Sequence, residues 1–175
     1  MMEIKEPESN KNFSFQCIDA IEVSLCIEKQ GLLFYEKAAK LAREPKVRDI
    51  FSRLAKEEKE HIQSLQDKAQ FLQPALVKKS VSRKEVDRYI AQELKGKVFP
   101  RLEETPEIAP ETMDDQKALD FGIDSERRSI EVLKDLLERE RKIDVRVVFS
   151  HLLAEERKHL SALQDLKESL YGSGD

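Results

Sequence analysis

Apolar residues recur at spacings of three and four along four stretches of the chain, which is the spacing of one buried face of an α-helix. The first two stripes consist of Ile18, Ile21, Leu25, Leu32, Tyr35 and Ala39, and of Val47, Ile50, Leu54, Leu65 and Leu72. The last two consist of Leu119, Ile130, Leu133 and Leu137, and of Val145, Val148, Leu152, Leu163, Leu166 and Leu170. This pattern predicts four amphipathic helices that pack as a bundle.

The four stripes form two copies of one unit. A shift of 98 residues aligns 20–67 with 118–165 without a gap, and 14 of these 48 positions are identical. Eleven of the identities lie in 47–67 and its counterpart 145–165, which share the pattern VR..FS.L..EE..H...LQD. An internal repeat predicts a repeated structural unit, which here is a helical hairpin.

Turn residues set the expected ends of these helices. Pro45 suits the first turn of the second helix, where its missing N–H would have no partner in any case. Asp144 is the expected cap of the fourth helix, and Gly172 is expected to end it.

A long segment, about residues 70–117, joins the two hairpins, and four prolines interrupt it: Pro74, Pro100, Pro106 and Pro110. One short helix is expected inside it, starting at Ser82 with Glu85 as the partner in a capping box. The segment is long enough to run back along the bundle as a crossover. We expect one domain over 13–171, preceded by a flexible N-terminus over 1–12.

Six polar residues interrupt the apolar stripes and are expected to point inward: Glu28, Glu58, His61, Glu126, Glu156 and His159. Residues three apart share a helix face, so each histidine lies beside the glutamate that precedes it in the motif ExxH. In each half, two of the glutamates are 30 residues apart, and their midpoints, Arg43 and Arg141, fall at the predicted turns. A hairpin folded there places both glutamates at one height.

Four buried carboxylates would bring about four negative charges into the core, at a cost of several kcal/mol per ion unless cations pair with them. Two divalent cations cancel that charge. One glutamate and one ExxH motif from each half form the ligand set of di-iron and di-manganese bundles. A single ExxH on a helix is more often a surface pair, but two copies in register are far less frequent by chance. Carboxylate and imidazole suit iron or manganese, and the lack of thiolate argues against structural zinc.

Composition and charge limit the partners and the cellular location that we expect for this protein. The net charge is −4 with basic and acidic residues mixed, so nucleic acid is not an expected partner. No apolar run approaches the roughly 20 residues of a membrane span, and the first residues lack a signal core, so a cytoplasmic location is expected. Cys17 and Cys26 form no CxxC pair and are interpreted as half-buried thiols.

The segments around the motifs resemble the rubrerythrin and erythrin group of the ferritin-like superfamily. The resemblance lies in GLLFYEKAAKLA, which starts three residues after Glu28, in FSRLAKEEKEH, which ends at His61, and in SIEVL and FSHLLAEERKH of the second half. It covers about residues 13–72 and 116–171 and implies a ferritin-like, all-α four-helix bundle.

The resemblance also implies a ligand arrangement. Glu58 and Glu156 would bridge two iron ions, or manganese or zinc in a crystal. One metal would be completed by Glu28 and His61, and the other by Glu126 and His159. No catalytic residue is expected apart from these ligands.

Three departures from the family pattern change the expectations. The rubredoxin domain is missing, so the electrons would come from an external donor such as a rubredoxin. The extra glutamate that rubrerythrins carry near the third-helix ligand has no counterpart among the neighbouring positions. Lys59 stands where bacterioferritins have the haem-binding methionine, so haem is not expected.

Three functions remain open on the sequence. The first is an oxidoreductase that reduces hydrogen peroxide or dioxygen at a di-iron centre and works as a homodimer. The second is a ferroxidase that handles iron, and the third is a metal-binding module without turnover.

Three further residues lie near the site. Tyr35, seven residues after Glu28, is either a hydrogen-bond donor to a ligand or a core tyrosine with a satisfied hydroxyl, and we favour the core role. Glu57 and Glu155 repeat between the halves about 100° away from the stripes. They could orient a ligand histidine, although solvent exposure is the interpretation that we favour.

Overall fold

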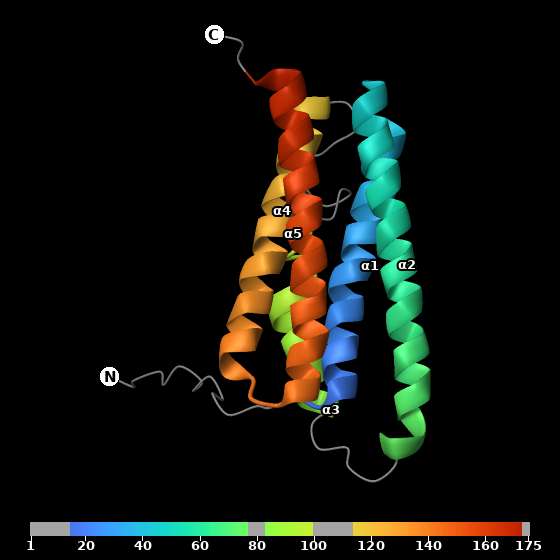
Figure 1. The fold of residues 1–175 in the computed structure, drawn as a ribbon, viewed down its shortest axis with the longest axis vertical. Helices are drawn as coiled ribbons and strands as arrows, with labels where there is room; N and C mark the ends of the chain where they lie inside the picture. Colours follow the sequence, from blue (N-terminus) through green and yellow to red (C-terminus); the bar gives the residue numbers. More distant parts are fainter. Residues whose placement is uncertain (1–14, 77–82, 100–113, 173–175) are drawn as a thin grey trace, which may run out of the picture.

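Four long helices make up most of the protein (Figure 1). The computed structural model describes residues 15–76, 83–99 and 114–172, so the expected flexible N-terminus lies outside the described residues. The long helices are α1 (Cys17–Leu41), α2 (Pro45–Leu76), α4 (Asp115–Arg139) and α5 (Ile143–Tyr171). The all-α prediction is confirmed, since the described residues contain no strand. Within the same ranges, none of the helices has both the length and the apolar character needed to cross a membrane.

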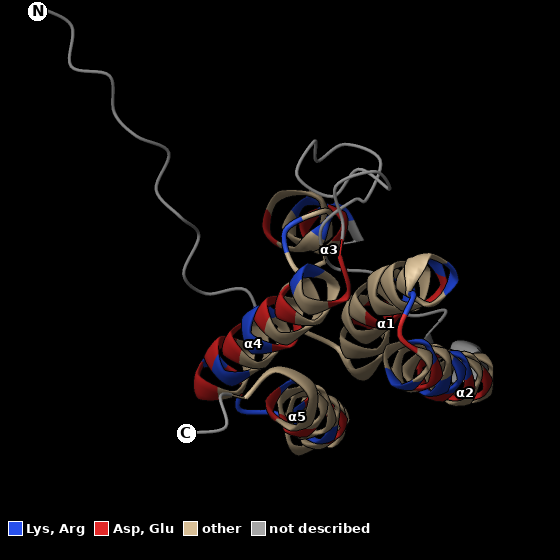
Figure 2. Cartoon of the chain, turned by 90° about the horizontal axis from the view of Figure 1, so that it is seen from above, with Lys and Arg blue, Asp and Glu red and all other residues tan. Residues whose placement is uncertain are grey.

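The four helices pair as two antiparallel hairpins, α1 with α2 and α4 with α5. Figure 2 shows the pairs side by side, and α1 also packs against both helices of the other pair. The turns fall at Arg43 and Arg141, where the repeat predicts them, because α1 ends at Leu41 and α4 ends at Arg139.

Carboxylates stabilise the two turns and connect them to segments far away in the sequence. The Asp115 carboxylate at the start of α4 accepts hydrogen bonds from the backbone N–H groups of Arg43 at 2.9 Å and Glu44 at 2.6 Å. In the second hairpin, the buried Glu140 carboxylate accepts from the N–H groups of Lys142 at 2.9 Å and Phe15 at 3.1 Å. Each turn is therefore tied to the opposite hairpin.

The helix ends follow the predictions with one exception. Pro45 begins α2, and Gly172 caps the C-terminus of α5. The expected cap at Asp144 is wrong, because α5 begins at Ile143 after Lys142, whose side chain makes no capping hydrogen bond. Asp144 lies inside the first turn instead, where its negative charge still favours the positive end of the helix dipole.

The crossover builds a third layer on one side of the bundle. α2 continues through Leu76, so the first residues of the expected 70–117 segment are helical. The short helix α3 (Arg83–Tyr89) starts close to the expected position and continues into the π-helix η1 (Ile90–Leu94). The expected cap, Ser82, lies outside the described residues. Figure 2 shows α3 beside α1 and α4, away from α2 and α5.

The end of the crossover is fastened to both helices that it covers. The backbone N–H of Gly96 donates to Gln30 of α1 at 3.0 Å, and Arg128 of α4 donates to the Val98 carbonyl at 2.9 Å. Gly96 has a positive φ of 75°, which glycine adopts without strain. These contacts place Phe99, which is 2% exposed, inside the core.

The buried face of α1 is wider than the predicted stripe. Leu25 and Leu32 are only half-buried, whereas Ile27 and Phe34 are fully buried. The extra burial arises because α1 is covered both by the other long helices and by the crossover.

Candidate metal centre

Six side chains from the four long helices meet inside the bundle. They are the six residues that interrupt the apolar stripes: Glu28, Glu58, His61, Glu126, Glu156 and His159. Five of them are at most 2% exposed, and the His61 side chain is 22% exposed. The structure therefore brings together every predicted ligand, whereas metal binding by these residues stays a prediction.

The ligand atoms fall into two groups that share Glu58. One group contains Glu28, Glu58 and His61, and the other contains Glu58, Glu126, Glu156 and His159; within each group the ligand atoms lie within 4.8 Å of one another. The resemblance implied that both Glu58 and Glu156 bridge two metals. In the structure Glu58 belongs to both groups, whereas Glu156 belongs to the second alone.

The two histidines turn the same ring nitrogen toward the carboxylates. Nδ1 of His159 lies 3.2 Å from Oε1 of Glu58 and 3.6 Å from Oε1 of Glu126. Nδ1 of His61 lies 3.5 Å from Oε2 of Glu28. The two rings are stacked, with centroids 6.0 Å apart and an interplanar angle of 16°. This arrangement leaves both Nε2 atoms pointing away from the centre.

Those outward nitrogens face the glutamates that precede the motif glutamates. Nε2 of His159 is 3.3 Å from Oε2 of Glu57, and Nε2 of His61 is 3.8 Å from Oε2 of Glu155. Each pair joins the two hairpins, because the histidine and the glutamate come from opposite halves. The side chain of Glu57 is 40% exposed and that of Glu155 is 20% exposed, so both are partly open to solvent, and their role in orienting the histidines stays a prediction. Their repetition at the same offset was the signal that could have identified them.

Two hydroxyl groups bind ligand oxygens in the half-site of His159. The fully buried Tyr35 hydroxyl donates to Oε1 of Glu126, and Ser129 donates to Oε1 of Glu156 at 2.7 Å. Tyr35 thus combines both sequence interpretations, since it is a core tyrosine whose hydroxyl is satisfied by a predicted ligand. The role of Ser129 was not predicted, although its position three residues after Glu126 places it on the same helix face.

A glycine makes room for the shared carboxylate. A Cβ atom at Gly31 would lie 3.2 Å from both Cδ and Oε1 of Glu58 and 3.3 Å from the ring of Phe99. Sequence reasoning missed both Gly31 and Phe99. Phe99 reaches this wall through the crossover, which helix periodicity does not describe.

Burial disfavours the charged form of the carboxylates in the cluster. Burial raises the pKa values of Glu58 and Glu126 well above their usual range, and the neighbouring carboxylates of Glu28 and Glu156, respectively, raise them further. Burial also opposes ionisation of Glu156, but contacts with His159 and Glu126 and the Ser129 hydrogen bond lower its pKa. The surrounding carboxylates overcome burial and raise the pKa of His159. These directions are those expected where buried carboxylates crowd around one imidazole.

The chemistry of the donor set fits metal ions. Among the described side chains, eight buried oxygen and nitrogen atoms make no hydrogen bond within the protein. Seven belong to the six residues of the cluster, and the eighth is the Ser24 hydroxyl. Unpartnered buried polar atoms are costly, and their concentration at one place indicates an ion that they would bind.

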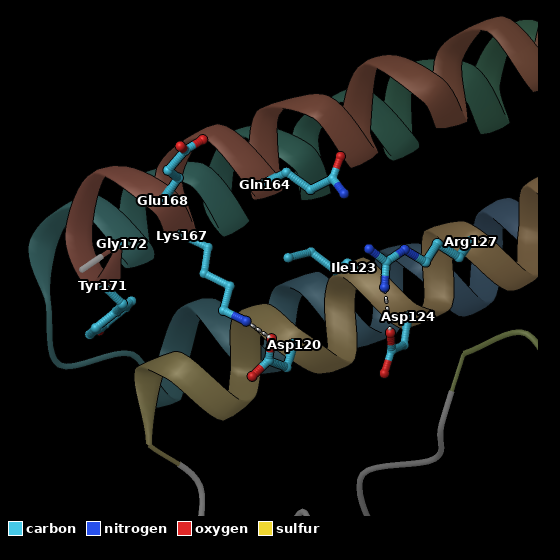
Figure 3. Close-up of a pocket in the computed structure, with 9 residues that line it drawn as sticks. All are labelled: Asp120, Ile123, Asp124, Arg127, Gln164, Lys167, Glu168, Tyr171 and Gly172. Carbon is cyan, nitrogen blue, oxygen red and sulfur yellow. Dashed lines mark hydrogen bonds and ion pairs between the residues drawn. The ribbon is translucent and has the colours of Figure 1, made fainter. Parts of the chain in front are cut away.

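A second hollow lies between α4 and α5, and its charged residues are paired differently from those of the buried cluster. Figure 3 shows it between α4 and α5, where Lys167 pairs with Asp120 and Arg127 lies 3.3 Å from Asp124. Four of its charged groups thus pair with one another on the surface, in contrast to the unpartnered atoms of the buried cluster.

Two hairpins that each contribute a buried glutamate and a Glu-x-x-His motif define the class of ferritin-like carboxylate bundles. The model of the Rubrerythrin family matches residues 19–167, so the chain belongs to the rubrerythrin family. No curated protein and no solved structure matches the chain.

Proposed function

We propose that this protein binds two iron ions and acts as an oxidoreductase that reduces hydrogen peroxide or dioxygen. The observation that carries the proposal is the pair of ligand groups that share Glu58. Two groups around one shared carboxylate suit two cations a few ångströms apart. Carboxylate and imidazole ligands without thiolate suit iron or manganese. When bound, a pair of such ions supplies two electrons to one oxidant molecule.

The residues of the chain would prepare this site for its ions. Glu28, Glu58 and His61 would hold one ion, and Glu58, Glu126, Glu156 and His159 the other. Glu57 and Glu155 would keep the histidine rings oriented through Nε2, as carboxylates do behind many metal-bound histidines. Tyr35 and Ser129 would fix the rotamers of Glu126 and Glu156 by donating to them.

An external donor completes the proposed reaction cycle. These 175 residues contain two cysteines, and a rubredoxin-type iron site needs four, so they do not hold such a site themselves. We propose an external donor such as a rubredoxin as the source of the electrons. We propose a homodimer in the cytoplasm as the working form. The family model supports iron binding but does not specify this reaction.

Anaerobic reconstitution with ferrous iron tests the proposal. We expect about two iron ions per chain, faster oxidation by hydrogen peroxide than by dioxygen, and near-ultraviolet absorption of an oxo-bridged product. An added reductase should then return the centre to the ferrous state. Binding of less than one ion per chain would overturn the proposal. One oxidation without re-reduction would favour a module without turnover, and assembly into a particle of many subunits would favour a ferroxidase.

A further inference from the structure

A pocket reaches the candidate metal centre from one side. It lies between α2 and α5 beside the start of α1, has a volume of about 340 Å³, and is bordered by Glu28 and His61. A water molecule in the liquid takes about 30 Å³, and pockets for small organic molecules begin at about 300 Å³. The pocket is therefore far larger than hydrogen peroxide or dioxygen requires.

The pocket is lined by both polar and apolar side chains. Lys68 and Asp144 are exposed, whereas Leu152 is buried and Leu65 and Val148 are half-buried. Leu65, Val148 and Leu152 thus give the pocket an apolar wall that is partly shielded from solvent. A ligand with an apolar body would gain free energy from leaving water there, at about 25 cal/mol for each Å² of apolar surface buried.

The pocket serves one half of the centre. His61 is 22% exposed and borders the pocket, whereas His159 is 2% exposed and does not. In the half-site of His159, the hydroxyls of Tyr35 and Ser129 already bind ligand oxygens. The ring of Phe99 packs near Tyr35, with centroids 5.8 Å apart, and closes the side that faces the crossover. The Glu28–His61 position is therefore the accessible one.

We propose that this pocket binds an organic hydroperoxide, with its apolar body against Leu65, Val148 and Leu152 and its O–O group at the Glu28–His61 position. This inference rests on the proposed function and names the substrate class of the same site. The O–O bond breaks, and two electrons and two protons convert the hydroperoxide to an alcohol and one water molecule. The electrons come from the external donor, and bound metal ions held by the six ligands would pass them to the hydroperoxide; the protons come from the solvent.

Cys17 also borders the pocket, and a thiolate could in principle reduce a hydroperoxide by itself. Burial and the nearby charge of Asp144 raise the pKa of this thiol. The reactive form is the thiolate, so a raised pKa disfavours thiol chemistry here. Hydroperoxide reduction that disappears in Cys17→Ser while hydrogen peroxide reduction persists would assign the reaction to the thiol and overturn the proposal.

Binding can be tested without turnover. The probe is 2-phenylpropan-2-ol, the alcohol product of cumene hydroperoxide, added to metal-free and to zinc-loaded protein and followed by calorimetry and ligand-observed NMR. Val148→Trp fills the pocket, and we expect it to weaken binding of the alcohol by about tenfold or more. The matched control is Ile50→Trp, since Ile50 is the repeat counterpart of Val148, is half-buried, and does not border the pocket. It should bind the alcohol as the parent protein does.

Reaction rates separate this inference from the proposed function. In the ferrous protein, Val148→Trp should slow oxidation by cumene hydroperoxide by about tenfold or more and leave oxidation by hydrogen peroxide within about threefold. If Val148→Trp does not fold, Val147→Trp, at a side chain that is 61% exposed, takes its place. Equal alcohol binding in the filled variant, or no binding by the parent protein, would overturn the inference while hydrogen peroxide reduction keeps the proposed function intact. A chain that binds no iron would overturn the proposed function itself.

Discussion

Nε2 of His159 in α5 lies 3.3 Å from Oε2 of Glu57 in α2. The next residue of α2, Glu58, lies 3.2 Å from Nδ1 of the same ring. Two consecutive glutamates of one hairpin therefore lie beside the two nitrogens of a histidine from the other hairpin. With a metal bound at Nδ1, a carboxylate at Nε2 would fix the orientation of the ring and raise the basicity of the nitrogen that binds the metal.

Loss of the Glu57 carboxylate should weaken metal binding at the His159 half-site. We expect Glu57→Gln to lower the affinity for the second ion by about 10- to 100-fold, the usual effect of removing a carboxylate behind a ligand histidine. Titration of the metal-free protein with cobalt, followed by its visible absorption, measures this. Glu155→Gln is the matched comparison, and a smaller effect is expected because Oε2 of Glu155 is 3.8 Å from His61, while its Oε1 binds Lys158 at 2.8 Å. Equal affinities in the parent and Glu57→Gln proteins would show that Glu57 is only a surface charge.

The shared position of Glu58 predicts unequal losses of metal among ligand variants. Glu28→Ala should keep about one ion per chain, because the second group of ligands is complete without it. Glu58→Ala should bind close to none, because it removes a ligand from both groups. Glu60→Ala, at an exposed side chain of the same helix, should keep both ions. Metal content per chain after reconstitution and desalting decides this, and a full ion retained by Glu58→Ala would contradict the shared role.

The bundle and the cluster could be predicted because both depend on periodicity. The 30-residue spacing between Glu28 and Glu58 fixes their common height once the turn lies at Arg43, and the structure has the turn there. The apolar stripe shows which face of each helix is inside. Burial of Glu126, at 0% exposure, follows from the same rule. Local pattern and global packing thus specify the same arrangement.

The rest of the site depends on contacts that no periodic pattern encodes. Phe99 enters the wall of the centre only because Gln30 and Arg128 fasten the end of the crossover. The orientation of Glu57 depends on how the two hairpins dock, since its partner lies on the other one. Asp144 failed as a cap because the chain enters α5 through Lys142, whose side chain donates to the Phe15 carbonyl at 2.9 Å. Each of these is a tertiary contact between segments far apart in sequence.

The close packing of Gly31 against Glu58 predicts that a larger residue at position 31 weakens metal binding. Alanine there should push the Glu58 carboxylate aside, since the added Cβ would lie 3.2 Å from it and 3.3 Å from Phe99. We expect metal affinity to fall by about tenfold, a loss of about 1.4 kcal/mol, although alanine favours the helix by about 1 kcal/mol. Gly122→Ala is the control, because its Cβ would meet the end of Leu163 and no ligand. Cobalt titration measures the metal affinity of both variants, and thermal unfolding measures their stability. An equal loss of metal affinity in the two variants would refute the close-contact interpretation.

Removal of metal should destabilise the fold through the same buried groups. Six unpartnered atoms of the cluster, which are the seven without Nε2 of His159, lose their proposed partners when a chelator removes the ions. A ligand present at about 1,000 times its dissociation constant stabilises a protein by about 4 kcal/mol, which for a chain of this size corresponds to about 10 °C in unfolding temperature. Calorimetry of metal-loaded and chelated protein should show this difference in the parent chain. The difference should vanish in Glu58→Ala, because both ions depend on that residue. A chelator that leaves the unfolding temperature of the parent unchanged would mean that the carboxylates and histidines satisfy one another without metal.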